Sequence, residues 1–104
     1  MNLDKDNMLT LGTIVKIQNI AVPVMVIGFS MINDKKDCYD YVGCPYPIGI
    51  PSTGEQILFN NNMIEEVIYK GYSDEDDIAF KEKHCKFLEE RKKENYLEKI
   101  KAEN

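Results

Sequence analysis

The placement of glycine and proline constrains this chain more than any other feature, because these residues interrupt regular structure. All six glycines and all four prolines lie at or before Gly71, and none occurs in the segment that follows. The first part of the chain is therefore predicted to form short elements joined by turns. The last part is predicted to form one long helix.

The predicted helix covers about residues 74–101 and has a strong N-terminal signal. Ser73 and Asp76 approximate a capping box, and the acidic residues at 74–77 lie where the helix dipole favours anions. At about 100° per residue, one arc of side chains is expected to dock on the rest of the protein. This arc consists of Phe80, His84, Phe87 and Leu88, with Ile78 and Cys85 at its margin.

The distal part of this helix has few large apolar residues after Leu88, which are Tyr96, Leu97 and Ile100. Three such residues cannot bury a helix face of this length. We therefore expect the distal helix to project from the domain, to meet a partner, or to form a homo-oligomer.

Five short segments before the helix are rich in β-branched and aromatic residues, which favour strands. They are residues 11–17, 22–29, 38–43, 56–59 and 66–71. The run at 22–29 is continuously apolar and is expected to be buried on both faces, with Pro23 at its start or on an edge. Asn60, Asn61 and Asn62 are expected to form one capped helical turn.

These elements predict an α+β fold in a single domain, residues 1–104. A small antiparallel five-stranded, barrel-like (SH3-like) β unit would cover about residues 9–72, and the C-terminal helix about residues 74–101.

Tyrosines gather around a proline-rich loop at residues 44–54, which holds three of the four prolines and excludes a regular central element. Tyr39 and Tyr41 stand two apart in a predicted strand and should share one face, and Tyr46 lies in the loop. Tyrosine joins a large apolar body to a polar tip and is enriched at interfaces. These side chains could form a recognition surface or complete a small core, and both interpretations remain open. The candidate partner-binding residues are Tyr39, Tyr41, Tyr46 and Pro47, together with Tyr96, Leu97 and Ile100 of the distal helix.

Charge and hydropathy exclude several classes of partner. A net charge of −5 repels phosphates, so neither nucleic acid nor an anionic membrane surface is an expected partner. The longest apolar run, at 20–29, is broken by Pro23 and is about half the length that a membrane-spanning helix needs. The N-terminus, residues 1–10, lacks a secretory signal, which indicates a cytoplasmic protein.

No group of side chains has the spacing of a known chemistry. The three cysteines, Cys38, Cys44 and Cys85, form no metal-binding knuckle and are expected to be free thiols, with a Cys38–Cys44 disulfide as the alternative. His84 adjoins Cys85, but neighbours on a helix point about 100° apart and do not make a nucleophile–base pair. Asp40 lacks a partner in the sequence and is expected on the solvated surface. We therefore expect a protein without metal, cofactor or catalytic residue.

Several ordered motifs resemble one family over about residues 9–80. They are Leu-Gly-Thr-Ile-Val-Lys from Leu11, Val-Met-Val-Ile-Gly from Val24, Tyr-Asp-Tyr-Val-Gly-Cys from Tyr39, Tyr-Pro-Ile-Gly from Tyr46, Ile-Leu-Phe-Asn from Ile57 and Ile-Glu-Glu-Val-Ile-Tyr-Lys-Gly-Tyr from Ile64. The set is similar to the family catalogued as domain of unknown function 4176. Its members look like small cytoplasmic proteins of Gram-positive bacteria, often encoded beside LXG-type toxins and type VII secretion genes. The distal helix lies outside the motifs.

The resemblance implies an accessory role, as a chaperone or adaptor that binds a neighbour-encoded toxin before export. Together with the absence of recognisable chemistry, it favours a non-catalytic protein-binding function. The alternative is a small-molecule or peptide sensor that uses Tyr39, Tyr41 and Tyr46 as its pocket.

Overall fold

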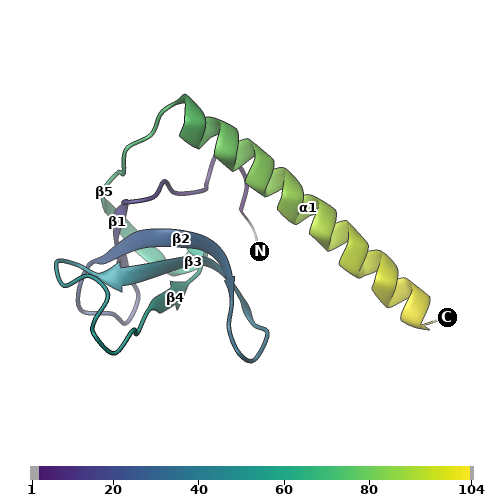
Figure 1. Cartoon of the computed structure of the whole chain (residues 1–104), viewed down its shortest axis with the longest axis horizontal. Coiled ribbons are helices and arrows are strands. Elements are labelled where there is room, and N and C mark those ends of the chain that lie inside the picture. Colours follow the sequence, from purple (N-terminus) through teal and green to yellow (C-terminus); the bar gives the residue numbers. More distant parts are fainter. Residues whose placement is uncertain (1–2, 104) are drawn as a thin grey trace.

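The computed structural model describes residues 3–103, with side chains described as far as Arg91. It contains one antiparallel sheet and one long C-terminal helix, so the α+β class is confirmed (Figure 1). The elements in chain order are β1 (Ile14–Ile17), β2 (Val24–Ile32), β3 (Cys38–Pro45), β4 (Ile57–Phe59), the 3-10 turn η1 (Asn61–Met63), β5 (Ile64–Tyr69) and α1 (Glu75–Glu103).

The five strands pair in the order β4-β3-β2-β1-β5, and every pair is antiparallel. The 3-10 turn leads from β4 to β5, and β5 returns to pair with β1. The prediction of a barrel-like unit was too strong, because the sheet does not close. Within residues 3–103 each of β4 and β5 pairs with only one strand, so the sheet stays open with these two strands as its edges.

The core forms where alternate residues of the central strands point to the same side of the sheet. Its fully buried members are Val15, Ile17, Val24, Val26, Tyr41 and Phe59. Burial of β2 on both faces was the expectation, but Met25 and Ile27 are only partly buried. The second face of β2 is thus half-covered, and Pro23 immediately precedes the strand as expected.

Asp40 connects β3 to the 3-10 turn. Its backbone N–H donates to Asn60 Oδ1 at 2.9 Å, and its Oδ2 accepts from the Asn61 backbone N–H at 2.8 Å. The expectation of a solvated Asp40 was wrong, because the residue is buried and its carboxylate is held by the Asn61 N–H. The predicted helical turn at the asparagines is confirmed.

The N-cap of α1 lies one residue later than predicted. The Asp77 backbone N–H donates to Asp74 Oδ1 at 3.0 Å, so Asp74 caps the helix. Ser73 instead donates from its hydroxyl to Asp77 Oδ2 at 2.7 Å. The acidic first turn of Glu75, Asp76 and Asp77 agrees with the helix dipole.

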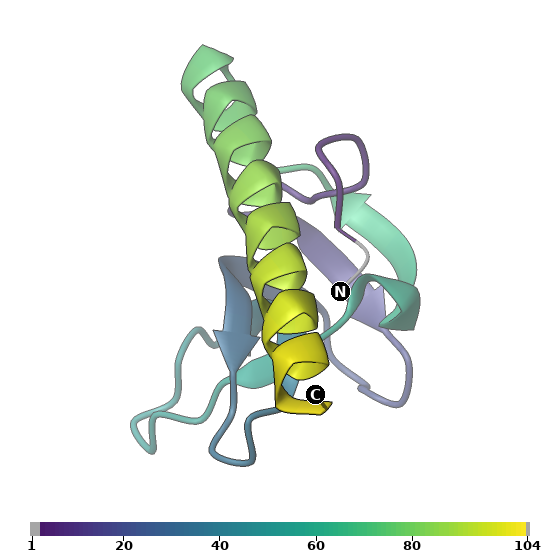
Figure 2. The same cartoon turned by 90° about the vertical axis from the view of Figure 1, so that its right-hand side faces the viewer.

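The first half of α1 packs beside the N-terminal segment and β2 (Figures 1 and 2). Cys85 and Leu88 are buried, and the Cys85 thiol lies 3.9 Å from Met8 Sδ. Phe87 was expected to dock but is 53% exposed, with the Arg91 guanidinium 5.8 Å above its ring. Leu88 of the predicted arc is therefore docked together with Cys85 from its margin, whereas the prediction for Phe87 was wrong.

Candidate binding surfaces

Tyr41 is a core residue and contributes no binding surface. Its side chain is 0% exposed, and its hydroxyl donates to Asn61 Oδ1 at 2.9 Å and accepts from the Leu9 backbone N–H at 3.1 Å. Burial raises the pKa of this hydroxyl to about 12. The expectation that Tyr41 contacts a partner was wrong. The Leu9 N–H and Asn61 Oδ1 bind its hydroxyl and hold the ring in the core, and the sequence does not show that these two groups lie near Tyr41.

The other two tyrosines of the predicted set lie apart from each other. Tyr39 is half-buried near the start of β3, opposite Met31, whereas Tyr46 follows the last residue of that strand. The tyrosines therefore do not enclose one pocket, as the sensor hypothesis assumed. Tyr96, Leu97 and Ile100 lie in α1 beyond the described side chains, so their role stays a prediction.

The proline-rich loop presents apolar side chains to solvent. We define the loop surface as Val22, Tyr46, Pro47, Ile48 and Ile50, of which Tyr46, Ile48 and Ile50 are 48%, 68% and 52% exposed. The backbone shapes this surface: the Tyr46 N–H donates to Pro23 O at 2.9 Å and the Gly49 N–H to Pro45 O at 2.8 Å.

Tyr46 and Pro47 were predicted members of this surface, whereas Val22, Ile48 and Ile50 were missed. The exposure of Ile48 and Ile50 could have been predicted, because Pro47, Gly49 and Pro51 flank them in the sequence. A segment of that composition cannot enter a central strand, so its apolar side chains have no place in the sheet.

A second apolar surface lies between the start of α1 and the sheet. A cavity of ≈410 Å³ is lined by Thr10, Leu11, Phe29, Tyr72, Asp76, Asp77 and Phe80, and we call it the aromatic groove. Leu11, Tyr72 and Phe80 are exposed. Sequence reasoning missed the groove because its lining comes from four separate segments of the chain.

The groove is joined to the core by a series of aromatic rings. Phe59 lies 5.2 Å from Tyr41, Tyr41 lies 6.1 Å from Phe29, and Phe29 lies 5.5 Å from Phe80, measured between ring centroids. Phe80 in turn stacks on His84 at 5.3 Å. Because the inner rings are buried, Phe29 and Phe80 have defined positions at the surface.

Asp77 fastens α1 to the segment before β1. Its Oδ2 accepts from the hydroxyls of Ser73 and Thr10 at 2.7 and 2.9 Å and lies 3.1 Å from Lys81 Nζ. Burial raises the pKa of Asp77. The hydrogen bonds from Ser73, Thr10 and Lys81 together lower this pKa by more than burial raises it, so the pKa lies below its usual value. The Asp77 carboxylate is thus ionised, and its negative charge is already paired with the ammonium group of Lys81.

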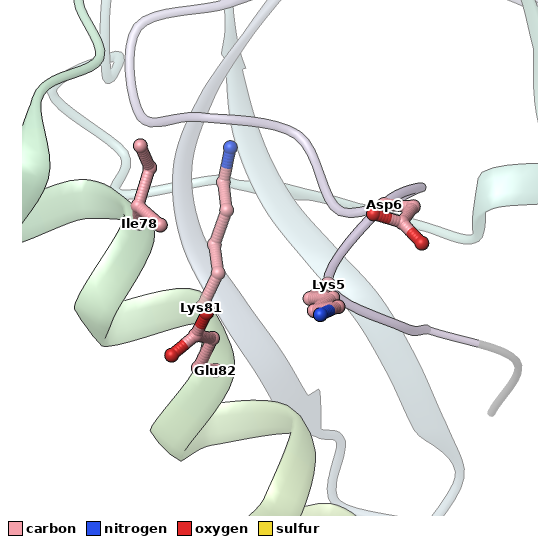
Figure 3. A pocket seen from close by; sticks show the side chains of 5 residues that line it. All are labelled: Lys5, Asp6, Ile78, Lys81 and Glu82. Carbon is pink, nitrogen blue, oxygen red and sulfur yellow. The ribbon is translucent and has the colours of Figure 1, made fainter.

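A smaller cavity of ≈280 Å³ separates α1 from the N-terminal segment. It is lined by Lys5, Asp6, Ile78, Lys81 and Glu82. Figure 3 shows Ile78, Lys81 and Glu82 on the helix, with Lys5 and Asp6 of the N-terminal segment across from them. Both signs of charge line this cavity, so it selects no particular class of ligand.

Ser30 and His84 form a contact that the sequence did not indicate. Ser30 Oγ lies 2.7 Å from His84 Nε2, and Ser30 adopts a left-handed backbone with φ of 53°. A serine nucleophile needs a base oriented by a third group. In the part of the chain with described side chains, no carboxylate contacts the other ring nitrogen of His84, so this third group is missing. The Ser30–His84 contact instead links α1 to β2.

The position of His84 predicts a loss of stability in mild acid. Burial lowers the pKa of His84 below 6.5, so the unfolded chain binds this proton at a higher pH than the folded chain. The free energy of unfolding should therefore fall as the pH decreases from 7.5 through 6.5 to 5.5. Urea denaturation at these pH values measures it. The variant His84→Gln should lose most of this dependence, and an equal dependence in both proteins would contradict the assignment.

Among the side chains of residues 3–91, no three His, Cys, Asp or Glu residues come together as metal ligands. No helix in the described part of the chain is long and apolar enough to cross a membrane. Cys38, Cys44 and Cys85 are free thiols, and only Cys38 is exposed.

Comparison with known proteins identifies the family. The chain matches no curated protein and no solved structure. A family model described as a domain of unknown function, DUF4176, matches residues 8–80, which include every strand and the first turn of α1. The chain therefore belongs to the DUF4176 family.

Proposed function

We propose that this protein is a non-catalytic accessory protein, a chaperone or adaptor, that holds a protein client. The observation that carries the proposal is the loop surface, where Tyr46, Ile48 and Ile50 are held in solvent by a hydrogen-bonded loop. Contiguous exposed apolar side chains on a small protein are typical of interaction sites. Tyrosine in such a surface is a frequent anchor of binding energy.

We infer that the client contacts side chains of the loop surface and does not add a strand to the edge of the sheet. β4 and β5 are the open edges of the sheet. β4 has only three residues, which is short for pairing with another chain, and the register of β5 with β1 shifts twice, between the partners of Ile14 and Val15 and between those of Lys16 and Ile17. Such irregularities disfavour pairing of an edge with another chain. The client is therefore proposed to dock on side chains of the loop and not to extend the sheet.

The proposed client is a neighbour-encoded secreted toxin of the LXG type, bound in the cytoplasm before type VII export. Membership of the DUF4176 family supports this choice through the gene context that the resemblance implies. The net charge of −5 disfavours nucleic acid and anionic membranes as partners and leaves a protein as the better candidate.

The alternative function is a sensor of a small molecule or peptide. The aromatic groove, at ≈410 Å³, is the feature that favours it, because ligand sites are concave and mainly apolar with a few polar groups. A sensor would bind its ligand through the groove in the absence of a client.

Co-expression with each neighbour-encoded protein, followed by affinity purification and size-exclusion chromatography, tests the proposal. We expect one neighbour to co-elute as a stable complex, and the charge-neutral surface change Ile48→Ser to weaken retention. Exposed Ile68 of β5 lies outside the loop surface, and Ile68→Ser is the matched control. Failure of all neighbours to bind the intact chain would contradict the proposal and leave the sensor as the better interpretation.

A further inference from the structure

We propose that the aromatic groove receives an arginine or lysine side chain of the protein client. This inference rests on the proposed function and adds a second contact site, which shares no residue with the loop surface. It assigns the groove to a cationic side chain flanked by apolar residues.

The groove offers flat apolar walls in fixed positions. Phe29 and Phe80 stand 5.5 Å apart with their planes tilted by 39°. Phe29 is supported from below by Tyr41, whose hydroxyl is fixed by two hydrogen bonds. Leu11 and Tyr72 complete the exposed lining. Because Phe29 and Phe80 are held in this way, they lose little conformational entropy when a side chain enters.

The charge of the groove is negative and incompletely neutralised. Its lining includes Asp76 and Asp77 and contains no lysine or arginine. Asp77 is engaged by Lys81 and by two hydroxyls, whereas Asp76 is exposed and, in the part of the structure with described side chains, makes no ion pair. The net field at the rim therefore attracts a cation.

These two properties together select a basic side chain. The face of an aromatic ring carries negative charge and attracts a cation, and guanidinium groups stack well on such faces. The aliphatic stem of arginine or lysine can lie along Leu11 while its head reaches Asp76. An acidic side chain would be repelled by Asp76, and an uncharged apolar one would bury part of that carboxylate without a partner.

The full-length chain tests this inference with defined probes. The probes are a synthetic amphipathic peptide of leucine and arginine, the same peptide with glutamate in place of arginine, and L-arginine methyl ester. Binding is measured by isothermal titration calorimetry at physiological salt, and the site is mapped by shifts of backbone amide resonances. We expect the arginine peptide to shift Leu11, Tyr72 and Asp76, and the glutamate peptide to cause no shift.

Matched variants separate the groove from general charge attraction. Phe80→Ala and Asp76→Asn should each weaken binding of the arginine peptide by about tenfold. Phe87→Ala removes an exposed ring of the same size from the same helix, and Glu90→Gln makes the same change in net charge, so both should leave affinity within about twofold. Circular dichroism checks the fold of Phe80→Ala, and Asp76→Asn tests the site without removing packed atoms.

Four outcomes would overturn the inference. Equal losses in the groove and control variants would indicate charge attraction alone, and equal affinity for the glutamate peptide would exclude a cationic site. Equal affinity for the arginine methyl ester and the peptide would assign the groove to a small cation. If a neighbour-encoded client binds the intact chain and the Phe80→Ala and Asp76→Asn variants alike, the groove assignment is wrong while the proposed function stands.

Discussion

Replacement of Phe59 by alanine is expected to lower the free energy of unfolding by about 4 kcal/mol, the range observed when a buried phenylalanine is truncated. Phe59 is fully buried, and its ring centroid lies 5.2 Å from that of Tyr41. It is also the anchor of β4, an edge strand of only three residues. Loss of the ring leaves a cavity beneath the strand that the short β4 ladder cannot close.

Urea denaturation followed by circular dichroism measures this effect. Phe87→Ala is the matched control, because the same atoms are removed from an exposed ring; its expected change is below about 0.5 kcal/mol. Similar midpoints for Phe59→Ala and Phe87→Ala would show that β4 does not close the core in the way described.

Replacement of Gly71 by alanine is expected to cost about 3 kcal/mol, at the upper end of the effects of inserting an atom into a packed site. A Cβ atom at Gly71 would collide with the backbone carbonyl oxygen of Leu11 and lie 2.9 Å from the backbone nitrogen of Thr13. Because both neighbours are backbone atoms, no side-chain rotation can relieve the clash. Moving the chain would also break the bond from the Gly71 N–H to Thr13 Oγ1, now 3.0 Å long.

Gly54→Ala separates this crowding from the general effect of alanine at a glycine position. Gly54 has a φ of 79° and nothing within 4 Å of an added Cβ atom, so its cost should be only that of the left-handed backbone, about 1 kcal/mol. A denaturation midpoint of Gly71→Ala equal to or above that of Gly54→Ala would show that residues 11–13 and 71 do not cross as closely as described.

Elements with a strong local signal were predictable from the sequence. The long segment free of glycine and proline formed α1, and the prolines of the loop kept Tyr46 and Pro47 out of a strand. Small errors arose where local signals compete. Ser73 and Asp74 are both good N-caps, and the choice between them depends on Asp77, whose side chain faces Thr10 in the folded protein.

Features that depend on contacts between distant segments were not predictable. The burial of Tyr41 depends on Leu9 and Asn61, and nothing in the local pattern distinguishes Tyr41 from Tyr39. The exposure of Phe87 follows from the side of α1 that meets Met8, since a helical arc gives a period but not an orientation. The aromatic groove likewise exists only when Leu11 and Phe80 come together across the fold.

We propose that the protein holds a client through its loop surface, and the affinity of a co-purified, neighbour-encoded protein tests this function most directly. Calorimetry with the intact chain, Tyr46→Ala and a chain lacking residues 91–104 compares the loop with the distal helix, and circular dichroism confirms that the variants stay folded. We expect Tyr46→Ala to weaken binding by more than about 1 kcal/mol, as loss of an anchor residue does, and truncation to weaken it if Tyr96, Leu97 and Ile100 also contact the client. Full affinity of Tyr46→Ala would contradict binding through the loop surface, whatever the effect of the truncation.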